Sequence, residues 1–241
     1  MRIIKSATAH AQACAAADWV CGHLLANPRS VLALPTGTTP LGLYSELINR
    51  ARDGSADFRA ATLFNLDEYC GLAPSDPRSY AAFLQQRLIT PLGLTPGQVR
   101  LLRGDAADME AECRDYDAAL HRCNGIDLCV LGLGVNGHIA FNEPGSPWNL
   151  RTHVVPLSST TRAAHRRQAL TPWNIPDCGV TMGIGTLLES RHVLLLIAGR
   201  DKAAARAAVF AGAADPLWPV TSLLAHPDLT VIELCEPEGH R

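Results

Sequence analysis

The sequence lacks an excess of charge of either sign, and this limits the partners that the protein could bind. Its 241 residues include 21 Lys and Arg against 23 Asp and Glu, which gives a formal net charge of -2. Proteins that bind nucleic acid or an anionic membrane surface usually carry a basic excess, because electrostatic attraction dominates such binding. We therefore expect neither nucleic acid nor a membrane as a partner. An anionic metabolite would need a local cluster of positive groups.

Long apolar runs are also missing. No segment reaches the roughly 18 consecutive apolar residues that a membrane-spanning helix needs. The Ala-rich stretch at 7–26 could imitate a signal peptide, but His10, Gln12, Asp18 and His23 interrupt it. No apolar stretch of signal-peptide length remains. The sequence therefore predicts a soluble, unprocessed protein.

The eight cysteines lack the spacings that are typical of zinc ligands or redox pairs. None forms a C-x-x-C pair, and no histidine stands at zinc-finger spacing from two of them. Several lie in apolar or helical runs, such as Cys129 in the run at 126–131. We interpret the cysteines as reduced, small core residues, which fits a cytoplasmic protein. No metal site is expected.

What the sequence does have is a regular alternation of apolar, strand-length runs with helix-patterned segments. With 47% hydrophobic residues, the chain is long enough for one large core. Strands are predicted at 2–4, 31–34, 61–65, 126–131, 192–198 and 230–234, and helices at 8–26, 40–52, 79–88, 107–122 and 202–210. This alternation predicts a doubly wound α/β fold, with a mostly parallel central sheet and helices on both faces. Since no repeat or linker interrupts it, we expect a single domain over residues 1–241.

Ligands of such sheets bind beyond the carboxyl ends of the strands, so loops that follow strands are the places to look for chemistry. The first such loop is LPTGTTP at 34–40. Three hydroxyls, a flexible glycine and a helix N-terminus could together bind an anion such as phosphate. The residues concerned are Thr36, Gly37, Thr38 and Thr39. An ordinary capped helix start is an equally good interpretation of this loop alone.

The second loop is FNLDEYCGL at 64–72, in which Asp67 and Glu68 follow a strand that should be buried. Adjacent residues at a strand end tend to point in different directions, so we expect only one carboxylate to face a site. A partly desolvated carboxylate in this position has a pKa suited to proton abstraction. The alternative is an acid that caps a helix or a turn.

The third loop is LGLGVNGHIAFNEPGS at 131–146, after the most apolar strand. An unperturbed histidine titrates near neutrality, which makes His138 a candidate acid or base. Glu143 is close enough in sequence to orient or pair with the imidazole, and Asn136 can hold other polar groups. A histidine and a carboxylate on a glycine-rich loop suit general acid–base chemistry. The glycine spacing differs from the dinucleotide-binding motif.

Together, LPTGTTP, FNLDEY and GVNGHIAFNEPGS resemble the glucosamine-6-phosphate deaminase family, and weaker similarities extend over essentially the whole chain. The resemblance implies that Asp67 is the base that moves a proton between carbons 2 and 1 of the open-chain sugar. It implies that His138 opens the pyranose ring with help from Glu143. Family members have Asp or Asn two residues before this histidine, and Asn136 stands there in this sequence.

The resemblance also implies a phosphate site made by the Thr-Gly loop together with Arg167 and Lys202. These two residues would supply the local positive charge that the overall composition does not. The reaction implied is the isomerisation and deamination of glucosamine 6-phosphate to fructose 6-phosphate and ammonia, with no metal or organic cofactor. Larger family members have an allosteric site, and the sequence differences near it predict weak or absent activation here.

Three other functions stay open at this stage. They are a 6-phosphogluconolactonase-like hydrolase, a galactosamine-6-phosphate deaminase, and a non-catalytic sugar-phosphate sensor. The sequence is compatible with a monomer or a homo-oligomer. Residues 144–178 are a candidate lid by composition.

Overall fold

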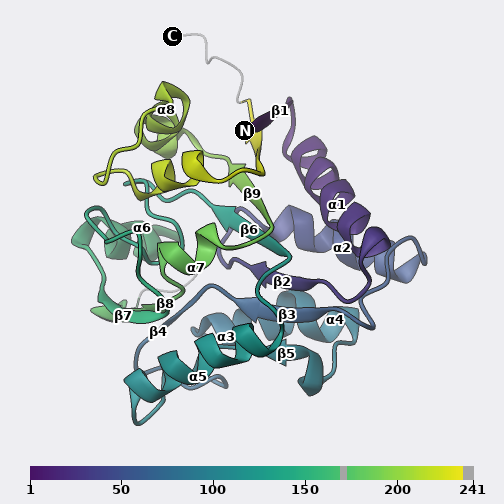
Figure 1. Cartoon of the computed structure of the whole chain (residues 1–241), viewed down its shortest axis with the longest axis horizontal. Coiled ribbons are helices and arrows are strands. Elements are labelled where there is room, and N and C mark those ends of the chain that lie inside the picture. Colours follow the sequence, from purple (N-terminus) through teal and green to yellow (C-terminus); the bar gives the residue numbers. More distant parts are fainter. Residues whose placement is uncertain (169–172, 236–241) are drawn as a thin grey trace.

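A parallel sheet forms the centre of the molecule (Figure 1). The structure is a computed structural model and describes residues 1–168 and 173–235. In these residues the main sheet has seven strands in the order β1-β10-β9-β6-β2-β3-β5, and every neighbouring pair is parallel. The strands are β1 (Arg2–Ser6), β2 (Val31–Leu34), β3 (Thr62–Asn65), β5 (Val99–Arg100), β6 (Leu128–Gly132), β9 (His192–Ile197) and β10 (Leu229–Leu234).

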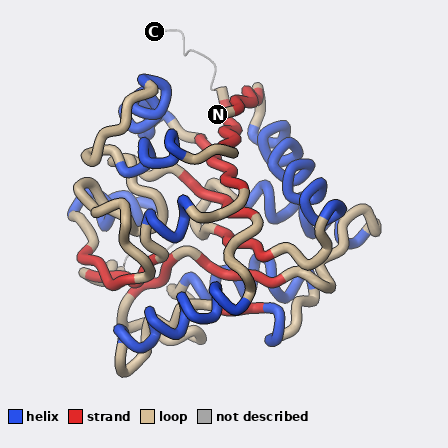
Figure 2. The backbone as a smooth tube through the Cα atoms, viewed as in Figure 1, coloured by secondary structure: helices blue, strands red, loops and turns tan. Residues whose placement is uncertain are grey.

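Helices cover both faces of this sheet, as Figure 2 shows. One face packs against α1 (Ala9–Ala26), α2 (Leu41–Arg52), α3 (Tyr80–Leu84), the π-helical turn η1 (Gln85–Ile89) and α4 (Thr90–Leu92). The other packs against α5 (Met109–Arg122), α7 (Ile184–Leu188), α8 (Ala203–Ala211) and the 3₁₀ helix η4 (Pro219–Ala225). Short 3₁₀ helices also occur at η2 (Pro96–Gln98) and η3 (Arg200–Lys202).

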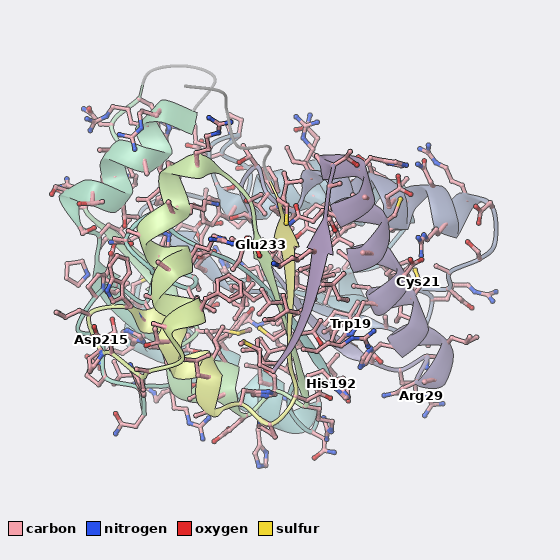
Figure 3. All side chains as sticks on the ribbon, turned by 90° about the horizontal axis from the view of Figure 1, so that it is seen from above. Trp19, Cys21, Arg29, His192, Asp215 and Glu233 are labelled. Atoms are coloured by element: carbon pink, nitrogen blue, oxygen red, sulfur yellow. The ribbon has the colours of Figure 1, made fainter. Side chains whose placement is uncertain are left out.

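Each central strand contributes side chains to both of the cores that these helices enclose. In β6, Leu128 and Val130 belong to the core under α1 and α2, and Cys129 and Leu131 belong to the core under α5 and α8. Successive side chains of a strand point to opposite faces, so a strand covered on both faces is apolar throughout. Seen from above, α1 (purple) lies on one side of β1 and β10, and the green helices from the C-terminal half of the chain lie on the other (Figure 3). The predicted doubly wound α/β fold is confirmed.

The predicted helices are present, with small shifts at their ends. Three of them begin at a side chain that accepts a hydrogen bond from the first turn: Thr8 for α1, Ser79 for α3 and Asp108 for α5. The segment predicted as one helix at 79–88 divides into α3 and η1. The helix α2 follows Pro40 without any side-chain cap.

A second, antiparallel sheet was not predicted. It contains β4 (Asp67–Tyr69), β8 (Cys178–Thr181) and β7 (His153–Pro156), in that order. One residue, Leu66, separates β3 of the large sheet from β4 of the small sheet. The helix α6 (Ser159–Gln168) follows β7 in the chain. The candidate lid therefore contains regular structure.

None of the helices within the described ranges is both long and apolar enough to cross a membrane.

Candidate active site

A cavity of about 620 Å³ lies at the carboxyl ends of β2, β3 and β6, and residues from all three predicted loops line it. The fold brings these loops together because parallel strands end at the same edge of a sheet. The predicted site residues that line the cavity are Thr36, Gly37, Thr38, Thr39, Asp67, His138 and Lys202.

One end of the cavity is suited to an anion. Gly37 has a φ of +93°, a conformation that residues other than glycine rarely adopt. The first turn of α2 lacks a side-chain cap. The N–H of Leu41 donates to the carbonyl oxygen of Thr38 (3.3 Å), and the next N–H groups of this turn are available to a ligand. Lys202 is 9% exposed, and its Nζ lies 3.3 Å from Thr39 Oγ1. Burial lowers its pKa, although the charge of Asp201 opposes this effect.

Lys202 has no salt bridge with any carboxylate in the part of the chain that the structure describes. A buried charge is costly unless an opposite charge or hydrogen bonds compensate it. A phosphate group bound between Lys202 and the first turn of α2 would supply that charge.

The adjacent carboxylates Asp67 and Glu68 point to different surroundings. Asp67 is 6% exposed and lines the cavity, and its Oδ1 has no hydrogen-bond partner within residues 1–168 and 173–235. Burial, followed by the charge of Glu68, raises the pKa of Asp67 well above its usual value. An uncompensated, desolvated carboxylate is a strong base once it is ionised.

Glu68 instead caps the start of α3. Its carboxylate accepts hydrogen bonds from the backbone N–H groups of Tyr69 (2.8 Å), Tyr80 (3.0 Å) and Ala81 (2.8 Å). Burial nevertheless raises its pKa to about 7, against the effect of these three bonds. The expectation that a single member of the pair faces the site agrees with this geometry.

His138 is oriented through Asn136, which bridges it to Glu143. Asn136 Nδ2 donates to Glu143 Oε2 (2.8 Å), and Asn136 Oδ1 lies 2.7 Å from His138 Nδ1. An ionised carboxylate can only accept, so the amide NH₂ faces Glu143 and the amide oxygen faces the imidazole. His138 Nδ1 must therefore carry the proton, and Nε2 has a free lone pair.

This imidazole is held in a confined position. Nε2 of His138 lies 2.3 Å from the place where a side chain at Gly134 would begin, so residue 134 must be a glycine. Burial lowers the pKa of His138 to about 4; the charge of Glu143 opposes this change and that of Lys202 adds to it. The ring is thus neutral at neutral pH and presents Nε2 as a base. Asn136 and Glu143 do not line the cavity; they lie behind His138.

Arg167 is the predicted site residue that the structure does not bring to the others. It lies in the last turn of α6, is exposed, and does not line the cavity. Residues 169–172, which follow it closely, lie outside the described ranges.

Several residues near the reacting groups were not predicted. Thr161 Oγ1 lies 3.1 Å from His138 Nδ1, and the backbone N–H of Ser158 donates to Glu143 Oε1 (3.0 Å). Arg78 and Arg87 line the cavity, and Arg78 is paired with Asp76. Apart from Thr161, which begins TRAAHRRQ at 161–168, these residues lie in helices and turns with no motif around them.

The wall of the cavity next to His138 was also not predicted. It is formed by residues from well-separated parts of the chain, namely Tyr69, Tyr80, Phe141, His165 and Trp173. His165 lies in TRAAHRRQ at 161–168, for which no helix was predicted, and nothing in this stretch indicates that its histidine faces a cavity.

Residues 5–231 match the family described as glucosamine-6-phosphate isomerases/6-phosphogluconolactonase. The chain belongs to this family. A glucosamine-6-phosphate deaminase of Geobacillus sp. (strain WCH70) is 39% identical to this chain. The similarity covers 96% of this chain and 92% of the Geobacillus protein. The deaminase of Halothermothrix orenii is also 39% identical, over 90% of each chain.

Solved structures of both kinds of enzyme named in the family description are similar to this chain, to different degrees. A monomeric glucosamine-6-phosphate deaminase is 37% identical to this family member, with a TM-score of 0.95 over 98% of each chain. The 6-phosphogluconolactonase of Thermotoga maritima is 19% identical, with a TM-score of 0.75 over 97% of this chain and 98% of its own. The second likeness shows a shared fold alone.

Proposed function

We propose that the protein converts glucosamine 6-phosphate to fructose 6-phosphate and ammonia. The observation that carries this proposal is that Asp67 and His138 line the same cavity, where His138 has a free Nε2 and Asp67 has a desolvated carboxylate with an unpaired oxygen. The reaction needs two bases at adjacent carbons of one sugar, and the cavity holds two. Relatives that are 37–39% identical over at least 90% of this chain are described as having this activity.

The phosphate of the substrate binds first, at Lys202 and the uncapped first turn of α2. Thr36, Thr38 and Thr39 supply hydroxyls there. The contact of Arg167 with the phosphate stays a prediction, because Arg167 is exposed on α6 and does not line the cavity. Binding at one end fixes the position of the sugar relative to the two bases.

Ring opening follows at His138. Its Nε2 accepts the proton of the anomeric hydroxyl, and the bond between carbon 1 and the ring oxygen breaks. The imidazolium that forms is stabilised through Asn136 by Glu143, whose pKa is lowered. Burial opposes ionisation of Glu143, but the nearby Thr161 hydroxyl, the charge of His138 and the hydrogen bonds from Ser158 and Asn136 together lower its pKa. The imidazolium returns its proton to the ring oxygen, which becomes the hydroxyl of carbon 5.

Asp67 then moves the proton that defines the isomerisation. Its carboxylate takes the proton from carbon 2 and returns it to carbon 1. The aldehyde oxygen of carbon 1 gains a proton that the substrate ammonium loses, which leaves a hydroxyl at carbon 1 and a protonated imine at carbon 2. Water adds to the imine and ammonia leaves, which gives the ketose. The amino group of the substrate, when it enters as an ammonium, favours the ionised form of Asp67.

An assay of three substrates tests the proposal. Glucosamine 6-phosphate, galactosamine 6-phosphate and 6-phosphogluconolactone are offered separately, with release of ammonia or opening of the lactone as the readout. We expect ammonia from glucosamine 6-phosphate with the highest kcat/KM. Lactone hydrolysis without ammonia release would replace the deaminase by the hydrolase, and preference for the galacto epimer would change the substrate.

The state and location of the protein are also proposed. We propose a monomer, because the relative with a TM-score of 0.95 is described as monomeric. A cytoplasmic location is favoured by the cysteines, all eight of which are free.

A further inference from the structure

A second imidazole, which the chemistry above does not use, faces the same cavity. His165 lies on α6, and its ring centroid is 6.1 Å from that of His138, with the two rings perpendicular. It also lies 5.8 Å from the ring of Phe141 and 6.0 Å from that of Tyr69. Both histidines are therefore fixed parts of one wall.

A chain of hydrogen bonds sets the proton position of His165. Tyr80 Oη donates to Tyr69 Oη (3.2 Å), and Tyr69 Oη lies 2.6 Å from His165 Nδ1. A tyrosine hydroxyl has one proton, and because Tyr69 accepts from Tyr80, its own proton is directed to His165. Nδ1 therefore accepts, and Nε2 carries the proton of the neutral ring. Burial, assisted by the charge of His138 and opposed by that of Glu143, lowers the pKa of His165 to about 4, so the ring stays neutral.

The Nε2–H group of His165 has no hydrogen-bond partner among the residues that the structure describes. It is also not among their fully buried unpaired atoms, so it is open to the cavity. The two histidines consequently present opposite hydrogen-bonding groups to a ligand. His138 offers the lone pair of Nε2, and His165 offers an N–H.

We infer that His165 Nε2–H donates a hydrogen bond to a hydroxyl oxygen of the phosphosugar, on a carbon between the reacting end and the phosphate. This assignment rests on the proposed function. With the phosphate at Lys202 and carbons 1 and 2 between Asp67 and His138, the hydroxyls of carbons 3 and 4 are left for the aromatic wall. A neutral donor in an apolar wall discriminates strongly against a substrate that lacks its partner, because the donor would be left unpaired.

Tyr69 is a positioning residue in this arrangement. Removal of its hydroxyl frees His165 Nδ1 to hold the proton, and Nε2 then becomes an acceptor. The same wall would then offer the hydroxyl of the sugar a lone pair in place of an N–H.

The test compares glucosamine 6-phosphate with its 3-deoxy and 4-deoxy analogues, using the wild-type protein, His165→Phe and His165→Gln. The wild type should prefer the parent substrate over one analogue by about 10- to 100-fold in kcat/KM, the range expected for one buried hydrogen bond. His165→Phe keeps the planar ring and loses the donor, so this preference should fall to within about three-fold of unity. His165→Gln retains an N–H near the position of Nε2 and should restore most of the preference.

Controls separate this inference from the proposed function. If the wild type releases no ammonia, the proposed function fails and the comparison does not arise. If ammonia is released but His165→Phe discriminates between parent and analogues as the wild type does, the inference is overturned. Competitive inhibition by inorganic phosphate should be unchanged in both variants, and a thermal melt confirms that each is folded. An equal loss for parent and both analogues would indicate a structural role and would also overturn the inference.

Discussion

The large parallel sheet and the small antiparallel sheet contribute different kinds of group to the cavity. Loops that follow the strands of the large sheet supply the anion site at Thr36–Thr39, the base His138, and Lys202. The small sheet and α6 supply hydroxyls and rings, such as Tyr69 and His165. The large sheet therefore positions the positive charge and the base His138. The small sheet provides neutral contacts that shape the site around them, apart from the carboxylate of Asp67 at the start of β4.

Asp67 stands where the two sheets meet. The chain leaves β3 at Asn65, and Asp67 is the first residue of β4. Asp67 therefore lies at the junction of the two sheets, just after the carboxyl end of β3 and at the start of β4. The comparison implies that substitutions in the loops of the large sheet should affect binding and chemistry directly. Substitutions of the neutral residues that the small sheet and α6 contribute should affect substrate selectivity or the stability of the fold.

The largest expected effect comes from Asp67 and its neighbour Glu68. Asp67→Asn keeps the size of the side chain and removes the base, so kcat should fall by about 10²- to 10⁴-fold. Exchange of the hydrogen at carbon 2 with solvent should be lost, and inhibition by inorganic phosphate should remain. Because Asp67 is a desolvated carboxylate with a raised pKa, its charge is unfavourable in the folded state, and the melting temperature of the variant should be equal or higher.

Glu68→Gln is the matched variant at the adjacent position. An amide cannot accept all three backbone hydrogen bonds that Glu68 receives, so one N–H is left unpaired. The free energy of unfolding should fall by about 1–3 kcal/mol. If the two variants behaved alike in activity and stability, the division of roles between these carboxylates would be wrong.

The next effect concerns Lys202 and tests the anion site of the large-sheet side. Lys202→Met keeps an unbranched chain and removes the charge, so kcat/KM should fall by about 10- to 100-fold, mainly through KM, as expected for the loss of a charge-assisted hydrogen bond. The inhibition constant of inorganic phosphate should rise in parallel. Lys5→Met is a control, because Lys5 is exposed on β1 and does not line the cavity. If phosphate inhibited Lys202→Met as strongly as it inhibits the wild type, the phosphate would bind at another place in the cavity.

How much the sequence could predict also differs between the two sheets. Buried parallel strands are recognisable because they are apolar on both faces, as in β6, and motifs at their ends follow directly in the chain. Thr36, Asp67 and His138 were therefore predicted and are brought together. The strands of the small sheet are three or four residues long, and polar residues such as Asp67, Glu68 and His153 occur in them. Such short segments show no clear alternation of apolar and polar residues from which a strand could be predicted.

The contacts of the small-sheet side depend on residues far apart in the sequence. Tyr69 and His165, which share a hydrogen bond, are separated by 96 positions. No local pattern relates them, and a histidine in an arginine-rich helix gives no sign that it faces a cavity. For the same reason, the sequence could not predict the tautomers of the two histidines. It also could not predict that Glu143 acts on His138 through Asn136.

The smallest effect tests the point at which the two sides are joined. Asn136 lies on a loop of the large sheet, and the carboxylate that it binds is itself held by the backbone of Ser158, just before α6. Asn136→Asp replaces a neutral bridge by a negative one beside His138. A nearby negative charge raises the pKa of an imidazole, so the pKa of His138 should rise from about 4 toward neutrality.

This shift has a defined sign in a pH profile. Below its pKa, His138 is protonated and cannot accept the anomeric proton, so the acid limb of kcat/KM for Asn136→Asp should move to higher pH. Above pH 8 the ring is neutral in both proteins, and the two rates should differ by only about three-fold, which corresponds to less than 1 kcal/mol. Asn136→Ala removes the bridge without adding charge, and its acid limb should not rise. If the acid limb moved equally in both variants, loss of the hydrogen-bonded bridge, and not the added charge, would set the pKa of His138. The pKa of this base would then depend on Glu143 and the start of α6 as much as on the large sheet.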